Sequence, residues 1–175
     1  DLFVSSGVNA FEQKSATTSG DSVTFDAVDL QALKKGFTTV SVSQLAQKDV
    51  YQSNITSDIV TPLAGLGELK IGDETFLTEG KTYKQLADEI TAKSGMNASV
   101  EQVGTNSYRL VIKSEELGID NALSITGAAS QALGYTTDGT AINTSNHILE
   151  AKNMLAKVDG VEYNVSSNSL VVDGL

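Results

Sequence analysis

The chain contains no cysteine and no tryptophan, a single proline, Pro62, and a single histidine, His147. Without thiols it can form no disulfide, and one imidazole alone cannot supply the ligand set of a zinc site. One X-Pro bond also limits slow isomerisation during folding. These absences suit a protein that crosses a barrier unfolded and refolds outside, and they equally suit many cytosolic bacterial domains.

Long apolar runs are absent too, so no segment approaches the roughly 20 residues that a membrane-spanning helix requires. Residues 1–5 lack the basic start of a signal peptide, as would a chain that begins inside a longer protein. The formal net charge is -10. Hydrophobic residues make up 40% of the chain, and this share argues against disorder. Because an acidic surface repels polyanions, we expect neither nucleic acid nor an anionic membrane as a partner.

Groups that carry catalysis are equally scarce. His147 lies in the loop-like sequence TSNH, where an incidental surface histidine is the ordinary interpretation. The polar pairs Glu115-Glu116 and Asp120-Asn121 fall in a predicted loop and are expected to face solvent, and the Asp-Gly steps lack the ligand spacing of an EF-hand. The sequence therefore predicts no enzyme, no catalytic residue, no metal site and no cofactor.

The clearest strand signal lies in residues 108–113. Tyr108, Leu110 and Ile112 fall on one face and the intervening residues on the other, which is the period of a half-buried strand. The turn residues 104–106 precede this strand and separate it from an earlier one. Further strands are predicted at 69–71 and 75–77 around a Gly-Asp turn, and at 123–125.

A helix is predicted over residues 83–93. Thr82 and Gln85 have the spacing of a capping box, and Gly95 stands where a helix C-cap is expected. The apolar positions that recur at helical spacing are Tyr83, Leu86, Ala87 and Ile90. A second, short helix is predicted over residues 128–133.

Strand signals fill both ends of the chain, with residues 22–28 (SVTFDAV) and 38–46 (TTVSVSQLA) near the start. Near the end, a hairpin is predicted around Asp159-Gly160, and a last strand runs through Leu170 and Val172. Leu45, Ala46 and Val50 either belong to the core or form an exposed interaction helix, and the core is favoured.

We therefore predict a strand-dominated α+β protein with mostly antiparallel sheets and one or two short helices. Two domains are expected. Residues 1–56 and 147–175 would form a discontinuous strand-rich domain, and residues 57–146 an inserted α+β domain, because an insertion leaves the host's termini free to pair.

The order of strand, helix, GMNAS (95–99) and YRLVIKSEELG (108–118) resembles the outer domains of the flagellar filament cap proteins, the hook-associated protein 2 family. Residues 40–54 and 151–175 are similar to further segments of that family. The chain departs from it at Leu170-Val171-Val172, where an acidic residue is more usual, and it lacks the family's coiled-coil segments. The central motif is shared with other flagellar hook and filament proteins.

The resemblance implies strand-rich, discontinuous outer domains of an extracellular protein at the flagellum tip, with flagellin as a partner. It further implies self-association into a cap oligomer in the full-length chain, and no catalytic residues. A related hook-associated or filament protein remains an alternative, as does a module that binds host surface molecules. The second alternative predicts a shallow groove with exposed aromatic side chains.

Overall fold

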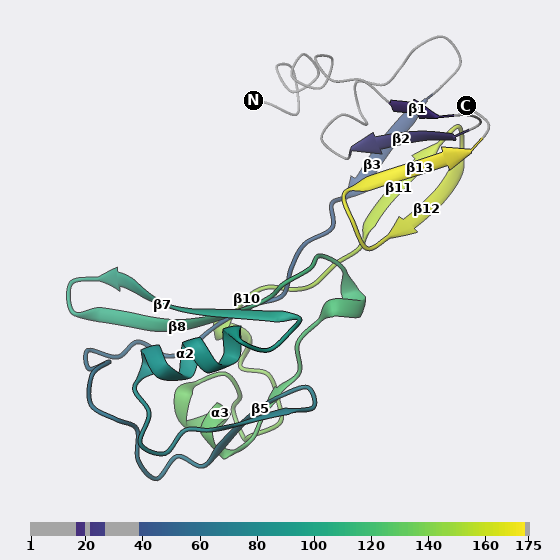
Figure 1. Ribbon diagram of the computed structural model, residues 1–175. Coiled ribbons are helices and arrows are strands. Elements are labelled where there is room, and N and C mark those ends of the chain that lie inside the picture. Colours follow the sequence, from purple (N-terminus) through teal and green to yellow (C-terminus); the bar gives the residue numbers. More distant parts are fainter. Residues whose placement is uncertain (1–16, 20–21, 27–38, 174–175) are drawn as a thin grey trace. The chain divides into compact units, whose positions relative to one another are not determined.

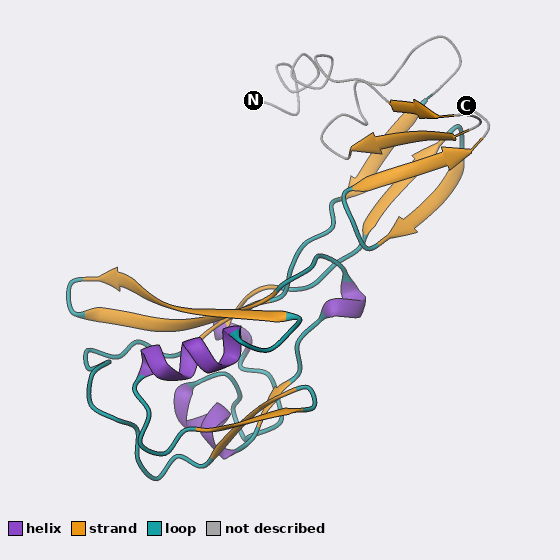
Figure 2. Cartoon of the chain, viewed as in Figure 1, coloured by secondary structure: helices purple, strands orange, loops and turns teal. Residues whose placement is uncertain are grey.

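The computed structural model describes residues 17–19, 22–26 and 39–173, and strands dominate its α+β fold (Figure 1, Figure 2). The strands of this part of the chain form four sheets, in which every pair of neighbours is antiparallel. Two short α-helices accompany them, and neither has the length and apolar character needed to cross a membrane. The predicted fold class is confirmed.

The chain divides into two compact units: residues 1–47, 117–120 and 152–175 form the first, and residues 48–116 and 121–151 form the second. The boundaries of the inserted domain expected from the sequence are residues 57 and 146. The second unit begins earlier and ends later than that. The reason is that β4 (Val50–Gln52) pairs with β8 (Ser107–Ser114) and with β10 (His147–Leu149). The independence of the two units stays a prediction.

The first unit contains two three-stranded sheets, and each combines strands from both ends of the chain. One sheet has the order β1-β2-β13, formed by Thr17–Ser19, Ser22–Asp26 and Ser169–Asp173. The other has the order β12-β11-β3, formed by Val161–Val165, Met154–Val158 and Val40–Gln44. The expected pairing of the last strands with the first region is thereby confirmed.

A small apolar cluster holds the described part of the first unit together. It contains the buried side chains Ala46, Met154, Ala156, Val158 and Leu170, with half-buried Val40 and Val42 packed against it. The hairpin around Asp159-Gly160 is confirmed, and both turn residues have positive φ, as a tight hairpin turn requires.

The alternative of an exposed helix through Leu45, Ala46 and Val50 is wrong. Ala46 is buried in the cluster of the first unit, Leu45 is exposed, and Val50 opens β4 of the second unit. The three side chains therefore serve different surroundings, since a strand and a short connection replace the helix on which they would have shared a face.

The second unit contains a four-stranded sheet, a three-stranded sheet and both described α-helices (Figure 1). The larger sheet has the order β10-β4-β8-β7, in which β7 spans Met96–Gly104. The smaller has the order β6-β5-β9, formed by Glu74–Leu77, Glu68–Ile71 and Ile125–Thr126. The helices are α2 (Tyr83–Thr91) and α3 (Ala128–Leu133).

Local sequence explains how α2 begins. The Thr82 hydroxyl accepts the Gln85 backbone N–H at 3.2 Å, and the Gln85 side chain accepts the Thr82 N–H at 2.9 Å, which confirms the predicted capping box. The helix ends at Thr91 with Ala92 as its C-cap, so Gly95 does not have the expected capping role. Its buried side chains are the four predicted ones, Tyr83, Leu86, Ala87 and Ile90.

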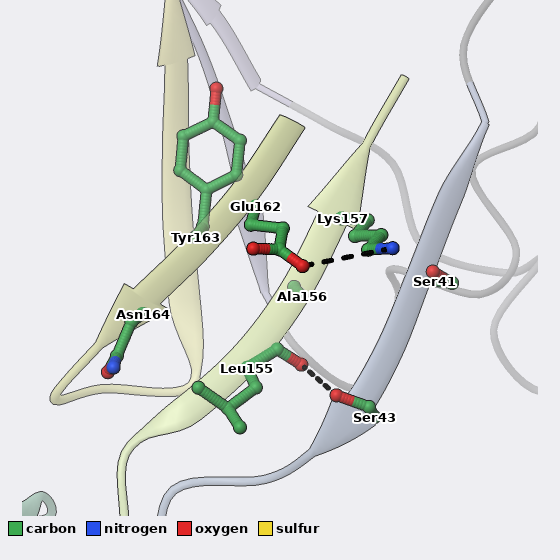
Figure 3. A pocket seen from close by; sticks show the side chains of 8 residues that line it. All are labelled: Ser41, Ser43, Leu155, Ala156, Lys157, Glu162, Tyr163 and Asn164. Atoms are coloured by element: carbon green, nitrogen blue, oxygen red, sulfur yellow. Dashed lines mark hydrogen bonds and ion pairs between the residues drawn. The ribbon is translucent and has the colours of Figure 1, made fainter. Parts of the chain in front are cut away.

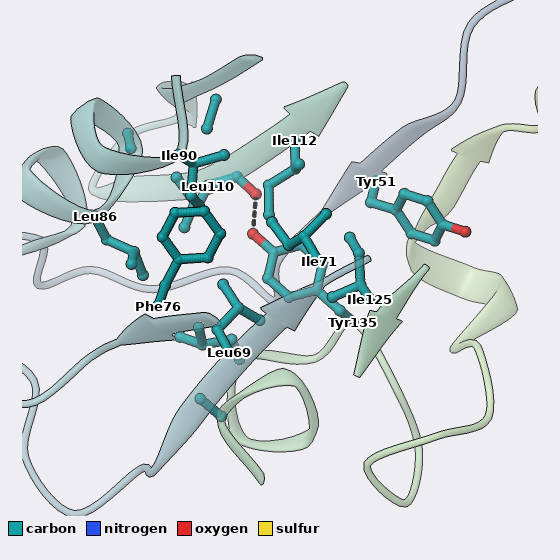
Figure 4. Close-up of a cluster of buried hydrophobic side chains, with 14 of the residues drawn as sticks. Tyr51, Leu69, Ile71, Phe76, Leu86, Ile90, Leu110, Ile112, Ile125 and Tyr135 are labelled. Carbon is teal, nitrogen blue, oxygen red and sulfur yellow. Dashed lines mark hydrogen bonds between the residues drawn. The ribbon is translucent and has the colours of Figure 1, made fainter. Parts of the chain in front are cut away.

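The core of the second unit lies where α2 and the two sheets meet (Figure 4). Of the predicted inner face of β8, Leu110 and Ile112 are fully buried there, whereas Tyr108 is half-buried. The Tyr135 hydroxyl donates a hydrogen bond of 2.6 Å to the Leu110 carbonyl, so this buried phenol is satisfied inside the core. The other large side chains labelled in Figure 4 are Tyr51, Leu69, Ile71, Phe76, Leu86, Ile90 and Ile125.

Candidate functional site

The two polar pairs singled out in the sequence lie at the surface. Glu115, Glu116, Asp120 and Asn121 are exposed, as expected, and the Glu115 carboxylate accepts the backbone N–H of Gly95. Among the described residues, no three His, Cys, Asp or Glu side chains lie close enough together to hold a metal ion.

His147 is not the surface loop residue that its sequence context predicts. It opens β10, and only 14% of its side chain is exposed. Its Nε2 atom lies 2.6 Å from Oδ1 of Asp49, whose side chain is 3% exposed. Because a carboxylate only accepts, Nε2 is the donor in this hydrogen bond. The ring of Tyr51 stacks on the imidazole with 4.1 Å between ring centroids.

The remaining contacts of Asp49 are with the backbone. Oδ1 also accepts the N–H of Ala151 at 3.0 Å, and Oδ2 accepts the N–H of Leu123 at 2.7 Å. Asp49 and His147 are similar to two members of a hydrolytic triad in residue type only, because here the carboxylate satisfies buried amides as well as the imidazole. The geometry of the pair is that of a structural hydrogen-bond network.

The pKa of the Tyr51 phenol is shifted by its place in this network. Burial, and to a smaller extent the negative charges of Asp49 and Glu150, together raise this pKa from 10.0 to about 12. The neutral phenol is therefore the form that the folded unit accommodates.

Alkaline pH is expected to destabilise the second unit through this phenol. Between pH about 10 and about 12 the unfolded chain loses a Tyr51 proton that the folded chain retains. The free energy of unfolding therefore falls by up to about 1.4 kcal/mol per pH unit there, and this contribution is intact below pH about 10. In Tyr51→Phe, the decrease in the free energy of unfolding per pH unit should be smaller by that amount. The measurement is urea unfolding at several pH values, followed by the circular dichroism of the helices. Tyr163→Phe, in the first unit, is the control, and an unchanged slope in Tyr51→Phe would contradict the assignment.

The first unit has a hollow of about 620 Å³ over β3, β11 and β12 (Figure 3). Its polar groups include the ion pair Lys157–Glu162, at 3.8 Å, and the Ser43 hydroxyl, which donates to the Leu155 carbonyl. Its lining within the described part of the chain is Ser41, Ser43, Leu155, Ala156, Lys157, Glu162, Tyr163 and Asn164. The one aromatic side chain among these residues, Tyr163, packs against the cluster of the first unit. These described residues therefore do not supply the several exposed aromatic side chains expected of a host-binding groove.

No protein-family model matches the chain. Among curated proteins, it is 28% identical over 186 residues to flagellar hook-associated protein 2 of Escherichia coli O157:H7, a match that covers 97% of this chain. It is 30% identical over 173 residues to the protein of that name from Campylobacter jejuni, which covers 75% of this chain. The chain is a homologue of flagellar hook-associated protein 2. It spans 37% of the length of the first relative and 27% of the second, so it corresponds to one part of them.

Solved structures show which part of hook-associated protein 2 has this fold. The D2-D3 domains of the Escherichia coli flagellar cap protein FliD superpose with a TM-score of 0.61 at 23% identity, and the match covers 91% of both chains. A structure of the D1-D2-D3 domains gives a TM-score of 0.63 and covers 98% of this chain but 56% of the longer one. The two units of this homologue thus have the fold of the outer domains of a cap protein, as the resemblance in the sequence implied.

Sequence reasoning missed Asp49. It lies in QKDVYQ, where no periodic pattern surrounds it, and a lone aspartate beside a lysine is ordinarily an exposed residue. Its one available signal was its place within a segment similar to hook-associated protein 2, which does not indicate burial.

Proposed function

We propose that this chain supplies the two outer domains of a flagellar filament cap, a structural part that promotes assembly of flagellin at the filament tip. The observation that carries the proposal is the match to hook-associated protein 2 over 97% of the chain. The fold of solved cap-protein outer domains adds support, because the likeness extends through both units.

The location and partners follow from the same proposal. A cap acts outside the cell at the flagellum tip, binds flagellin as it arrives, and self-associates into an oligomer through the full-length chain. The acidic chain, with its net charge of -10, disfavours strong self-association of the outer domains alone, because like charges repel. Weak contacts between these domains would gain strength once other segments raise their effective concentration.

Deletion in a motile bacterium tests this role. Removing this segment from the full-length cap protein should leave flagellin exported, while filaments become few and short and monomeric flagellin accumulates in the medium. Electron microscopy of cells and immunoblotting of the medium separate failed assembly from failed export. The point variant Leu77→Asp, at an exposed position of β6, is the matched control and should retain normal filaments. Normal filaments after the deletion would contradict the proposal.

A further inference from the structure

The chain passes between the two units four times, after residues 47, 116, 120 and 151. Each of these passages is therefore also the beginning or the end of a segment of the second unit, and that segment end must be held in place. An end that is not held would fray, because a segment terminus makes bonds on one side only.

One residue bonds to the segment beside every passage. Asp49 follows the first passage by two residues, and its backbone exchanges bonds with Ser114, just before the second. The Asp49 N–H donates to the Ser114 hydroxyl, and the Ser114 N–H donates to the Asp49 carbonyl, each at 2.9 Å. Its carboxylate accepts the N–H of Leu123, just after the third passage, and that of Ala151, the last residue before the fourth.

The carboxylate is held in turn by groups of the second unit. His147 donates to Oδ1, and its ring is fixed by stacking on Tyr51, whose hydroxyl donates to the Leu123 carbonyl at 3.3 Å. Because the Asp49 side chain is 3% exposed, water cannot take over the bonds that it makes. A charged acceptor makes stronger hydrogen bonds than a neutral one, so the arrangement favours a carboxylate over an amide.

We infer that Asp49 is a clasp that closes the second unit at the four passages of the chain, with His147 as its positioning residue. The Asp49 clasp comprises the bonds of Asp49 to Ser114, Leu123, Ala151 and His147. While it is closed, the peptide bonds beside the passages are protected from local opening. When it is open, those segments fray while the core around Leu110 stays folded. This inference does not depend on the proposed function.

Asp49→Asn tests the clasp with almost no change in volume. The amide replaces one acceptor by a donor, so it turns an N–H group toward another N–H donor and leaves both unsatisfied. The readout is hydrogen exchange of the full chain under native conditions, measured at the Leu123 and Ala151 amides. These two N–H groups are chosen because each donates directly to the Asp49 carboxylate. We expect their exchange to become about tenfold faster and nearly independent of added urea, as local opening requires.

A core variant separates the clasp from general stability. Ile90 is fully buried in α2, so Ile90→Val or Ile90→Ala can be chosen to match the loss of unfolding free energy in Asp49→Asn. The matched variant should leave exchange at the Leu123 and Ala151 amides unchanged. Asp88→Asn, which removes an exposed carboxylate from the ion pair with Lys84, controls for charge and should also have no effect.

His147→Phe keeps the stacked ring but removes the hydrogen-bond donor to Asp49. This variant provides the test of the inference if Asp49→Asn fails to fold. It should accelerate hydrogen exchange at the Leu123 and Ala151 amides about threefold, without affecting the amides of α2. Equal acceleration by Asp49→Asn and the Ile90 variant would overturn the inference, because exchange would then require global unfolding. Unchanged exchange in both Asp49→Asn and His147→Phe would also overturn it.

Discussion

Leu110→Asp is expected to abolish cooperative folding of the second unit. Leu110 is fully buried in β8, an inner strand of the larger sheet, and its carbonyl accepts a hydrogen bond from the hydroxyl of Tyr135. An unpaired carboxylate in that place loses its hydration and the packing of leucine, a loss of more than about 4 kcal/mol. Since domains of this size are stable by only about 5–15 kcal/mol, this loss removes a large share of the free energy of unfolding. Circular dichroism at the helix band is the measurement, because both described α-helices belong to the second unit.

The same substitution at an exposed leucine is the matched control. Leu77 lies at the end of β6 with 59% of its surface exposed, so Leu77→Asp should change the free energy of unfolding by less than about 0.5 kcal/mol. A Leu110→Asp protein that melts at the wild-type temperature would contradict the position assigned to β8 in the core.

Removal of the whole second unit is expected to leave the strands of the first unit folded. The backbones of Gln47 and Lys152 exchange two hydrogen bonds, of 3.0 and 3.1 Å, so these residues face each other as a hairpin's last pair does. Replacing residues 48–151 by Asn-Gly should therefore close the gap with a two-residue turn. The deletion also removes Leu117, which packs on the cluster of the first unit, at a loss of about 1 kcal/mol. A strand spectrum with a cooperative thermal transition is the expected result.

The boundaries chosen from the sequence provide the comparison. Deleting residues 57–146 instead would retain β4 and β10 without β8, exposing Tyr51 and an unpaired strand edge. That protein should melt at a lower temperature and aggregate sooner than the one that lacks residues 48–151. Loss of all strand signal in both deletions would favour one continuous core and contradict the division into two units.

Local patterns in the sequence were sufficient for the elements whose bonds are local. The start of α2 follows from Thr82 and Gln85, three residues apart, and its buried face from apolar residues within nine positions. The hairpin at Asp159-Gly160 likewise needs only two turn residues and the strands beside them. The family resemblance added a predicted function, which such local patterns cannot contain.

Tertiary structure alone decided the boundaries of the second unit and the surroundings of Asp49. β4 has three residues, too few to show a period, and its place in the sheet depends on a partner about 60 positions away. The Asp49–His147 bond spans 98 positions, and neither residue has a neighbour that indicates burial. Local sequence determines which face of a segment is apolar. Which distant segments meet, and which polar groups are buried when they do, depends on the packing of the whole unit.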